Sequence, residues 1–274
     1  MTAPTTTPVT RALPRPRRGV VLSLARQEGR RLLRHPVMLA GLTLYLGLAV
    51  WGLVTDPSPR TSLSILTYLP SFGPGVFGIL AANLLASRDA RAGSTEVLSP
   101  APARAQERVL AQCLACLAPT LLVLGTTLVL WGGLTALGRW EDAPALGHLL
   151  QGPLTVAGGT LLGVALAVWA PFRATGVVAL VVMVMANLWL GGRDDGGMLF
   201  GPMVDWAAWG AFHQDRWVGF VPGDPGWHAV YLAGLGLAAA AGAVVRVAER
   251  RAPVVAVLAA AVGLAVLGGI GQLP

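Results

Sequence analysis

The chain has 274 residues, of which 54% are hydrophobic and only 12% charged, and its formal net charge is +7. A soluble domain usually carries about 25% charged residues, so this composition leaves little of the chain for one. All 20 basic residues are arginine. The chain therefore cannot hold a Walker A nucleotide loop or a Schiff-base centre, because each of these needs a lysine.

The positive charge does not predict a nucleic-acid partner. The arginines gather in short clusters between apolar segments, as they do in the cytoplasmic loops of membrane proteins. The partner that this pattern predicts is the lipid bilayer.

The amino-terminal region is predicted to have two parts. Residues 1–19 are rich in threonine, proline and arginine, which favours a disordered cytoplasmic tail. From Val20 to Arg34 the apolar residues fall near one face, which predicts an interfacial amphipathic helix leading into the first span. The alternative is an ordinary arginine-rich flank. The charged residues assigned to this helix are Glu28, Arg30, Arg31 and Arg34.

Seven apolar segments approach the roughly 20 residues that a helix needs to cross the hydrocarbon core. The fold predicted for residues 20–274 is therefore a single all-α domain, a polytopic transmembrane bundle. Pro70, Gly73, Pro74 and Gly75 should bend or unwind the outer half of the second span, and Pro119 should kink the third span or start it late. The last segment is short for a span, so the expected number is six to seven. The segments are 37–54, 65–87, 109–137, 149–170, 174–192, 228–247 and 253–271.

Charge asymmetry predicts the orientation. With the amino terminus in the cytoplasm, the inner segments hold most of the arginines, while the outer segments hold Arg60, Arg139, Arg193 and Arg216 and are rich in aspartate. Such a bias is typical of a multi-pass protein of the cytoplasmic membrane.

The outer segment 193–227 is rich in aromatic residues. Trp206, Trp209, Trp217 and Phe220 recur at helical spacing on one face. Indole rings favour the headgroup level of a bilayer, so we expect an interfacial or re-entrant helix. The alternative is an aromatic surface that binds a ligand.

Residues with catalytic potential do not form a recognisable centre. Cys113 and Cys116 form a C-x-x-C pair inside an apolar helix, where packing is the favoured interpretation. A zinc site that includes His213 and His228 is conceivable. A membrane enzyme acting on lipid or peptide would need Asp205, His213, Asp215 or His228 to converge. We expect neither a catalytic residue, a metal nor a cofactor.

The inner loop 88–108 is longer than the other inner connections. Ser94 or Thr95 can cap a short helix through Val97 and Leu98, which Pro100 then stops. A short helix with two exposed aliphatic residues suits docking to a protein partner. The alternative is a solvated loop.

This loop resembles the signature of type-2 ATP-binding-cassette (ABC) exporter permeases. The resemblance lies in Arg88-Asp89, Arg91, Gly93-Ser94-Thr95-Glu96-Val97-Leu98, Pro100, Pro102 and Arg104. The run from Leu24 to Pro36 is similar to the amphipathic helix that precedes the first span in that family. Two departures are Ser94, which separates glycine from threonine, and a seventh span where the family usually has six.

The resemblance implies a permease subunit docked on a separately encoded ABC ATPase and paired with a second permease copy or a homologous permease. It implies a coupling helix around Glu96 and no ATPase site in this chain. The residues that it places at the ATPase contact are Arg88, Asp89, Arg91, Glu96, Val97 and Leu98. The alternatives are the membrane enzyme above and a membrane scaffold without transport.

Overall fold

The structure is a computed structural model that describes residues 17–91, 103–140, 143–191 and 224–271. Within these ranges the chain is helical and contains no β-strand. Six continuous helical segments are long and apolar enough to cross a membrane. By helix length and hydropathy, the predicted class of a transmembrane helix bundle is confirmed.

The first two helices meet at His35. Helix α1 (Arg18–Leu33) begins two residues before the predicted start, and α2 (Pro36–Thr55) is the first span. His35 caps α2, because its Nδ1 accepts a hydrogen bond from the Val37 N–H at 3.3 Å. Burial lowers the pKa of His35, which keeps the ring in the neutral form that can accept this bond. Pro36 follows at the first helical position, where its missing N–H costs nothing.

The second span is a continuous helical segment, Thr61–Ala86, with a distortion in its middle. It consists of α3 (Pro59–Thr67), a π-helical turn η1 (Ser71–Gly75) and α4 (Val76–Ala86). Pro74 lies inside the π-turn and has no N–H to donate, which accounts for the break in the α-helical pattern. The irregularity predicted at Pro70 to Gly75 is therefore present, as a π-helical turn.

The third span is divided at Cys116 into α6 (Ala105–Ala115) and α7 (Leu117–Ala136). Pro119 lies in the first turn of α7, so a new helical segment starts there, which is the late start that the sequence allowed as an alternative to a kink. The whole segment has 32 residues and rises about 48 Å, whereas the hydrocarbon core is about 30 Å thick. Several turns of it must therefore extend beyond the hydrocarbon.

The remaining helices decide the number of spans. Helices α8 (Leu146–Trp169), α11 (Pro225–Val247) and α12 (Arg251–Gly271) are each long enough to cross. The last of these confirms the seventh predicted segment. Helix α9 (Thr175–Gly191), at the fifth predicted segment, has only 17 residues. Six of the seven predicted spans therefore correspond to helical segments long and apolar enough to cross a membrane, and α9 is shorter than these six.

The second and fourth spans form the centre of the bundle. Buried residues make up 67% of the apolar window in Thr61–Ala86 and 56% in α8, but only 22% in α2 and in α12. Glycines let α8 approach its neighbours closely: Gly152 faces Pro70, Gly159 faces the Gly75 carbonyl and Gly163 faces the Ile79 carbonyl.

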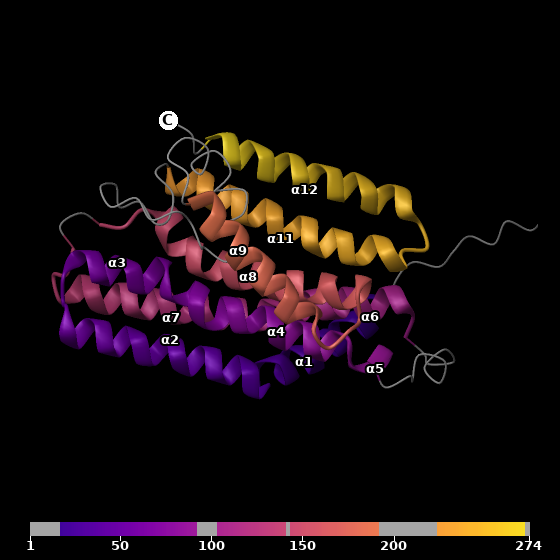
Figure 1. Ribbon diagram of the computed structural model, residues 1–274, viewed down its shortest axis with the longest axis horizontal. Coiled ribbons are helices and arrows are strands. Elements are labelled where there is room, and N and C mark those ends of the chain that lie inside the picture. Colours follow the sequence, from indigo (N-terminus) through magenta and orange to yellow (C-terminus); the bar gives the residue numbers. More distant parts are fainter. Residues whose placement is uncertain (1–16, 92–102, 141–142, 192–223, 272–274) are drawn as a thin grey trace, which may run out of the picture.

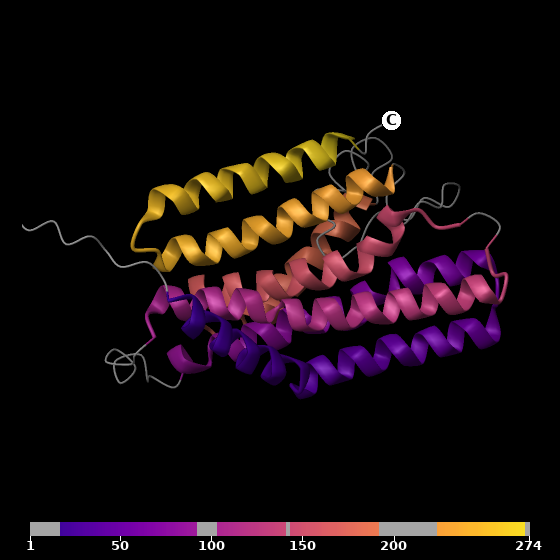
Figure 2. The same ribbon diagram turned by 180° about the vertical axis from the view of Figure 1, so that it is seen from behind.

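The two ends of the bundle carry different elements. Figure 1 shows α1, α5 (Arg88–Arg91), α6 and the connection between α11 and α12 at one end, and the carboxyl end of α12 at the other. Figure 2 shows the same separation from behind. The described residues of the predicted inner segments thus share one end, which we call the arginine-rich end.

The apolar face of α1 is covered by protein. Its buried residues, Val21, Ala25, Gly29 and Leu32, face inward, and α1 packs mainly on α6 and α7. Gly29 lies against Ala115 and Ala118. The sequence led us to expect this face to lie in lipid, as in an interfacial helix. In the structure this face packs on α6 and α7 of the third span, and the position of α1 relative to the bilayer stays a prediction.

Candidate functional site

The predicted coupling loop is described only at its two stems. Arg88, Asp89 and Arg91 form α5, and the chain is described again from Ala103. The central residues Glu96, Val97 and Leu98 lie outside the described residues, as do Trp206, Trp209, Trp217 and Phe220 of the outer aromatic face. The coupling helix and the re-entrant helix therefore remain predictions, and the stems are the part of the site that can be analysed.

The first stem is tied to α1 by Glu28. Its carboxylate accepts two hydrogen bonds from the Arg88 guanidinium, at 2.8 and 3.2 Å, and one from Arg31 at 2.8 Å. Only 12% of the Glu28 side chain is exposed. A carboxylate so enclosed is stabilised by a paired cation, and the bidentate contact with the Arg88 guanidinium is the stronger of its two ion pairs. Three of the residues predicted from the sequence thus lie together.

The second stem is tied to the start of α1 by Glu107, which is fully buried. Its Oε1 accepts hydrogen bonds from the main-chain N–H and the Nε of Arg17, at 2.9 and 3.2 Å. Its Oε2 accepts from Arg17 Nη2 at 3.1 Å and from the Arg104 N–H at 3.0 Å. Hydrogen bonding and charge attraction to Glu107 raise the pKa of Arg17, which stays charged at any physiological pH.

Glu107 and Arg17 were missed by the sequence interpretation. Arg17 was assigned to the disordered tail, and Glu107 was counted only as a loop charge. One local signal was available for Glu107: it stands three residues after the residue that precedes α6, where a glutamate often accepts from the free main-chain N–H. The ion pair with Arg17 joins residues 90 positions apart, so no local sequence pattern predicts it.

Further contacts at this end fix the stems. Arg91 donates to the carbonyls of Leu84 and Ser87, which are among the last of α4. Arg104 lies 3.5 Å from the carboxylate of Glu249, in the connection between α11 and α12. The second stem is therefore tied to the residue that precedes α1 and to the connection between α11 and α12.

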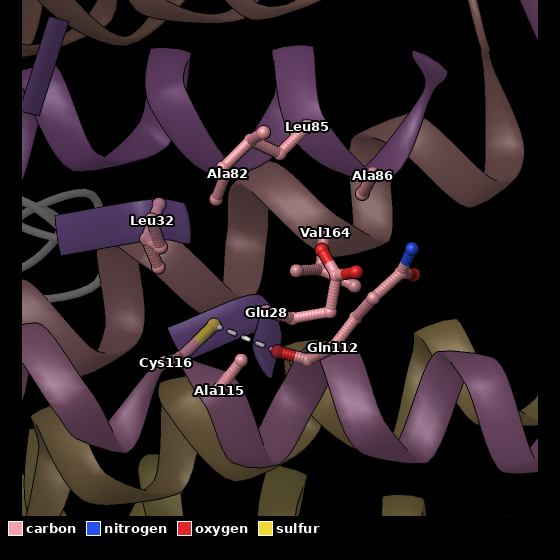
Figure 3. Close-up of a pocket in the computed structure, with 9 residues that line it drawn as sticks. All are labelled: Glu28, Leu32, Ala82, Leu85, Ala86, Gln112, Ala115, Cys116 and Val164. Carbon is pink, nitrogen blue, oxygen red and sulfur yellow. Dashed lines mark hydrogen bonds between the residues drawn. The ribbon is translucent and has the colours of Figure 1, made fainter. Parts of the chain in front are cut away.

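A small cavity lies behind the Glu28 ion pair. Figure 3 shows its lining, which includes Glu28 of α1, Gln112 of α6, Val164 of α8 and Cys116. Its volume of about 20 Å³ is enough for one water. Cys116 is buried and donates to the Gln112 carbonyl, in keeping with the packing interpretation of the C-x-x-C pair.

The residues of the enzyme alternative are mostly outside the described part. Asp205, His213 and Asp215 lie there, while His228 is buried on α11 with its ring 5.9 Å from that of Tyr231. Across the described ranges, groups of three or more metal-ligating side chains do not occur.

Comparison with known proteins gives no relative. The chain matches no family model, no curated protein and no solved structure.

The Glu28 contact makes a first prediction. Arg88→Gln should release the first stem and raise the rate of trypsin cleavage after Arg91 and Arg104 about two- to fivefold, because a partly exposed pair contributes up to about 1 kcal/mol and cleavage tracks the open population. The measurement is limited proteolysis of the purified chain, with fragments identified by mass spectrometry. Arg31→Gln is the control, since it leaves the bond between Glu28 and Arg88 in place. Equal rates in the two variants would contradict the role of Arg88.

Proposed function

We propose that this chain is the membrane-spanning permease subunit of an ABC exporter. It would move a substrate across the cytoplasmic membrane with energy from ATP hydrolysis on a separate ATPase subunit. In this proposal the chain itself does not hydrolyse ATP. The residues that bind and cleave ATP belong to the partner, and the lysine that a nucleotide loop requires is absent from the sequence.

The observation that supports this proposal most is the anchoring of the loop between the second and third spans. Its first stem is ion-paired to α1 through Arg88 and Glu28. Its second stem is ion-paired to the start of α1 through Glu107 and to the connection between α11 and α12 through Arg104. A force applied to residues 92–102 would therefore reach helices at both sides of the bundle.

The length of the third span adds to this argument. The apolar residues of α1 are buried against α6, and in the proposal these two helices project together beyond the hydrocarbon. A cytoplasmic partner that moves α6 would also move α7, because both belong to the third span. In the proposal, the ATPase contacts Glu96, Val97 and Leu98, and its closure on ATP moves α6.

The expected assembly contains two permease chains and two ATPase subunits. A pathway between two membrane domains needs a second copy of this chain or a homologous permease. Wide apolar faces on α2 and α12 are exposed in the single chain and are available for that partner or for lipid. Transport then follows from alternating movement of the two membrane domains, with no bond made or broken by this chain.

A double substitution in the loop tests the proposal. Glu96→Arg with Leu98→Asp reverses the charge and removes the aliphatic contact at the proposed docking helix. We expect the ATPase subunit that co-purifies with the tagged wild-type chain to fall at least about tenfold in amount, as expected when a central apolar contact and a charge pair are lost together. The measurement is subunit stoichiometry after affinity purification, with ATP hydrolysis by the recovered complex.

Leu137→Asp is the control for this experiment. Leu137 is 69% exposed at the opposite end of the bundle, so its substitution introduces a comparable acidic group away from the loop. A complex that assembles and hydrolyses ATP normally with the loop variant, or a wild-type chain that recovers no ATPase subunit, would refute the proposal.

A further inference from the structure

A groove of about 750 Å³ runs along the exposed side of α1 at the arginine-rich end. Four of its nine lining residues are arginines, and Pro36 and Leu85 give it an apolar part. The residues that matter are Arg26, Arg30, Arg31, Arg34, His35 and Leu85. Leu85 comes from the end of α4, so the groove is built from two elements that are distant in the sequence.

Three of these arginines have no counter-charge within the described part of the chain. Arg26, Arg30 and Arg34 follow one another at four-residue spacing, which places them in a row on one side of α1. Other arginines nearby are paired: Arg31 and Arg88 bind Glu28, Arg17 binds Glu107. Asymmetry of charge across a membrane explains why arginines occur at this end, but it does not explain three unpaired guanidinium groups in one groove.

The chemistry of the groove selects a phosphate. A guanidinium group presents a planar fork of N–H donors that fits two phosphate oxygens at once. Three such groups in a row repel one another unless an anion lies between them. The favoured ligand therefore carries a net negative charge on a phosphate group.

The position of the groove selects a lipid as the source of that phosphate. The row from Arg26 to Arg34 spans about 12 Å along the helix, and the headgroup layer extends roughly 5–8 Å beyond the hydrocarbon on each side. The groove also contains Pro36, the first residue of the first span. Beyond it, α2 exposes Leu39 and Leu46, at 48% and 47% of their surface, where acyl chains can lie.

We propose that this groove, formed by the row Arg26, Arg30 and Arg34 beside the start of α2, binds the headgroup of an anionic phospholipid. The lipid would neutralise the row and hold α1 at the level of the bilayer surface while its apolar face stays packed on α6. The site is independent of the transport function proposed above, because it needs neither an ATPase nor a second permease chain.

The test is native mass spectrometry of the full-length chain. The purified protein is mixed with equal amounts of phosphatidylglycerol, which is anionic, and phosphatidylcholine, which has the same phosphate but no net charge. We expect the wild-type chain to retain phosphatidylglycerol preferentially. The variant R26Q/R30Q/R34Q should retain at least about tenfold less, since it loses three charge-assisted contacts. The variant R26K/R30K/R34K should fall between the two, because it keeps the charge and loses the fork.

The matched control is R173Q/R250Q/R251Q. It removes the same charge from three exposed arginines in the predicted inner connections, outside the groove. Equal loss of phosphatidylglycerol in the two glutamine variants would show a general charge effect and overturn the proposal. So would displacement of the lipid by inorganic phosphate at comparable concentration, since a lipid site must also use the acyl chains. A groove variant that keeps its lipid but loses a protein partner would assign the surface to that partner instead.

Discussion

Replacement of Glu107 by alanine is expected to lower the free energy of unfolding by about 3 kcal/mol. The substitution removes a fully buried carboxylate and leaves the partly buried main-chain N–H groups of Arg17 and Arg104 without this acceptor. It also removes the two hydrogen bonds of 3.2 and 3.1 Å from the Arg17 side chain to Glu107, although that side chain is 49% exposed and regains water. The expected loss therefore lies at the low end of the range for breaking a buried ion pair. The measurement is denaturant unfolding of the purified chain in detergent.

Two further variants make this result specific. Glu249→Ala removes the same group from an ion pair of 3.5 Å in which both side chains are about one-third exposed, so it should cost less than about 1 kcal/mol. Glu107→Gln keeps the volume but turns part of the acceptor into a donor, and it should fall between the other two. Similar small losses for Glu107→Ala and Glu249→Ala would mean that Glu107 does not anchor the second stem.

Gly163→Ala is the second substitution with a large expected effect, a loss of about 2–3 kcal/mol. A Cβ at this position would overlap the Ile79 carbonyl oxygen and would lie 3.0 Å from the Ala82 Cβ and 3.1 Å from the Asn83 nitrogen. Main-chain atoms cannot move aside as a flexible side chain can, so α4 and α8 must separate. That separation also breaks the hydrogen bond from Asn83 Nδ2 to the Gly163 carbonyl, which measures 3.4 Å.

Gly125→Ala is the matched control for this prediction. An added Cβ there meets no other atom within 4 Å. Because alanine favours a helix over glycine, the control should be neutral or more stable by about 0.5–1 kcal/mol. The readouts are the yield of monodisperse protein and the midpoint of denaturant unfolding. If both alanine variants behave alike, the close approach of α4 and α8 is not required for folding.

The arrangement of spans followed from the sequence because the bilayer imposes it locally. Roughly 20 apolar residues in a row must cross the hydrocarbon as a helix, whatever lies beside them. Pro74 and Pro119 act on their own helices, since each lacks an N–H, and both distortions were predicted at their observed places. The same reasoning gave a seventh segment at 253–271, which is long enough to span.

The same local rule leaves the shortest segment as a prediction. The fifth predicted span is helix α9, of which 17 residues are described. Hydropathy alone cannot say whether neighbouring helices shield such a segment or leave it unsupported.

The sequence by itself therefore determined the helical class, the positions of the spans and the kinks within them, because each depends on a few adjacent residues and on the surrounding lipid. Only the tertiary structure decided which surfaces meet. The apolar stripe of α1 could have faced lipid or protein with equal hydrophobic gain, and it packs on α6. Glu107 required a cation, and Arg17 became its partner only because folding brought together residues 90 positions apart. Which segments pack together and which charges pair depends on the shape and charge of residues far apart in the sequence, so only the folded structure decides it.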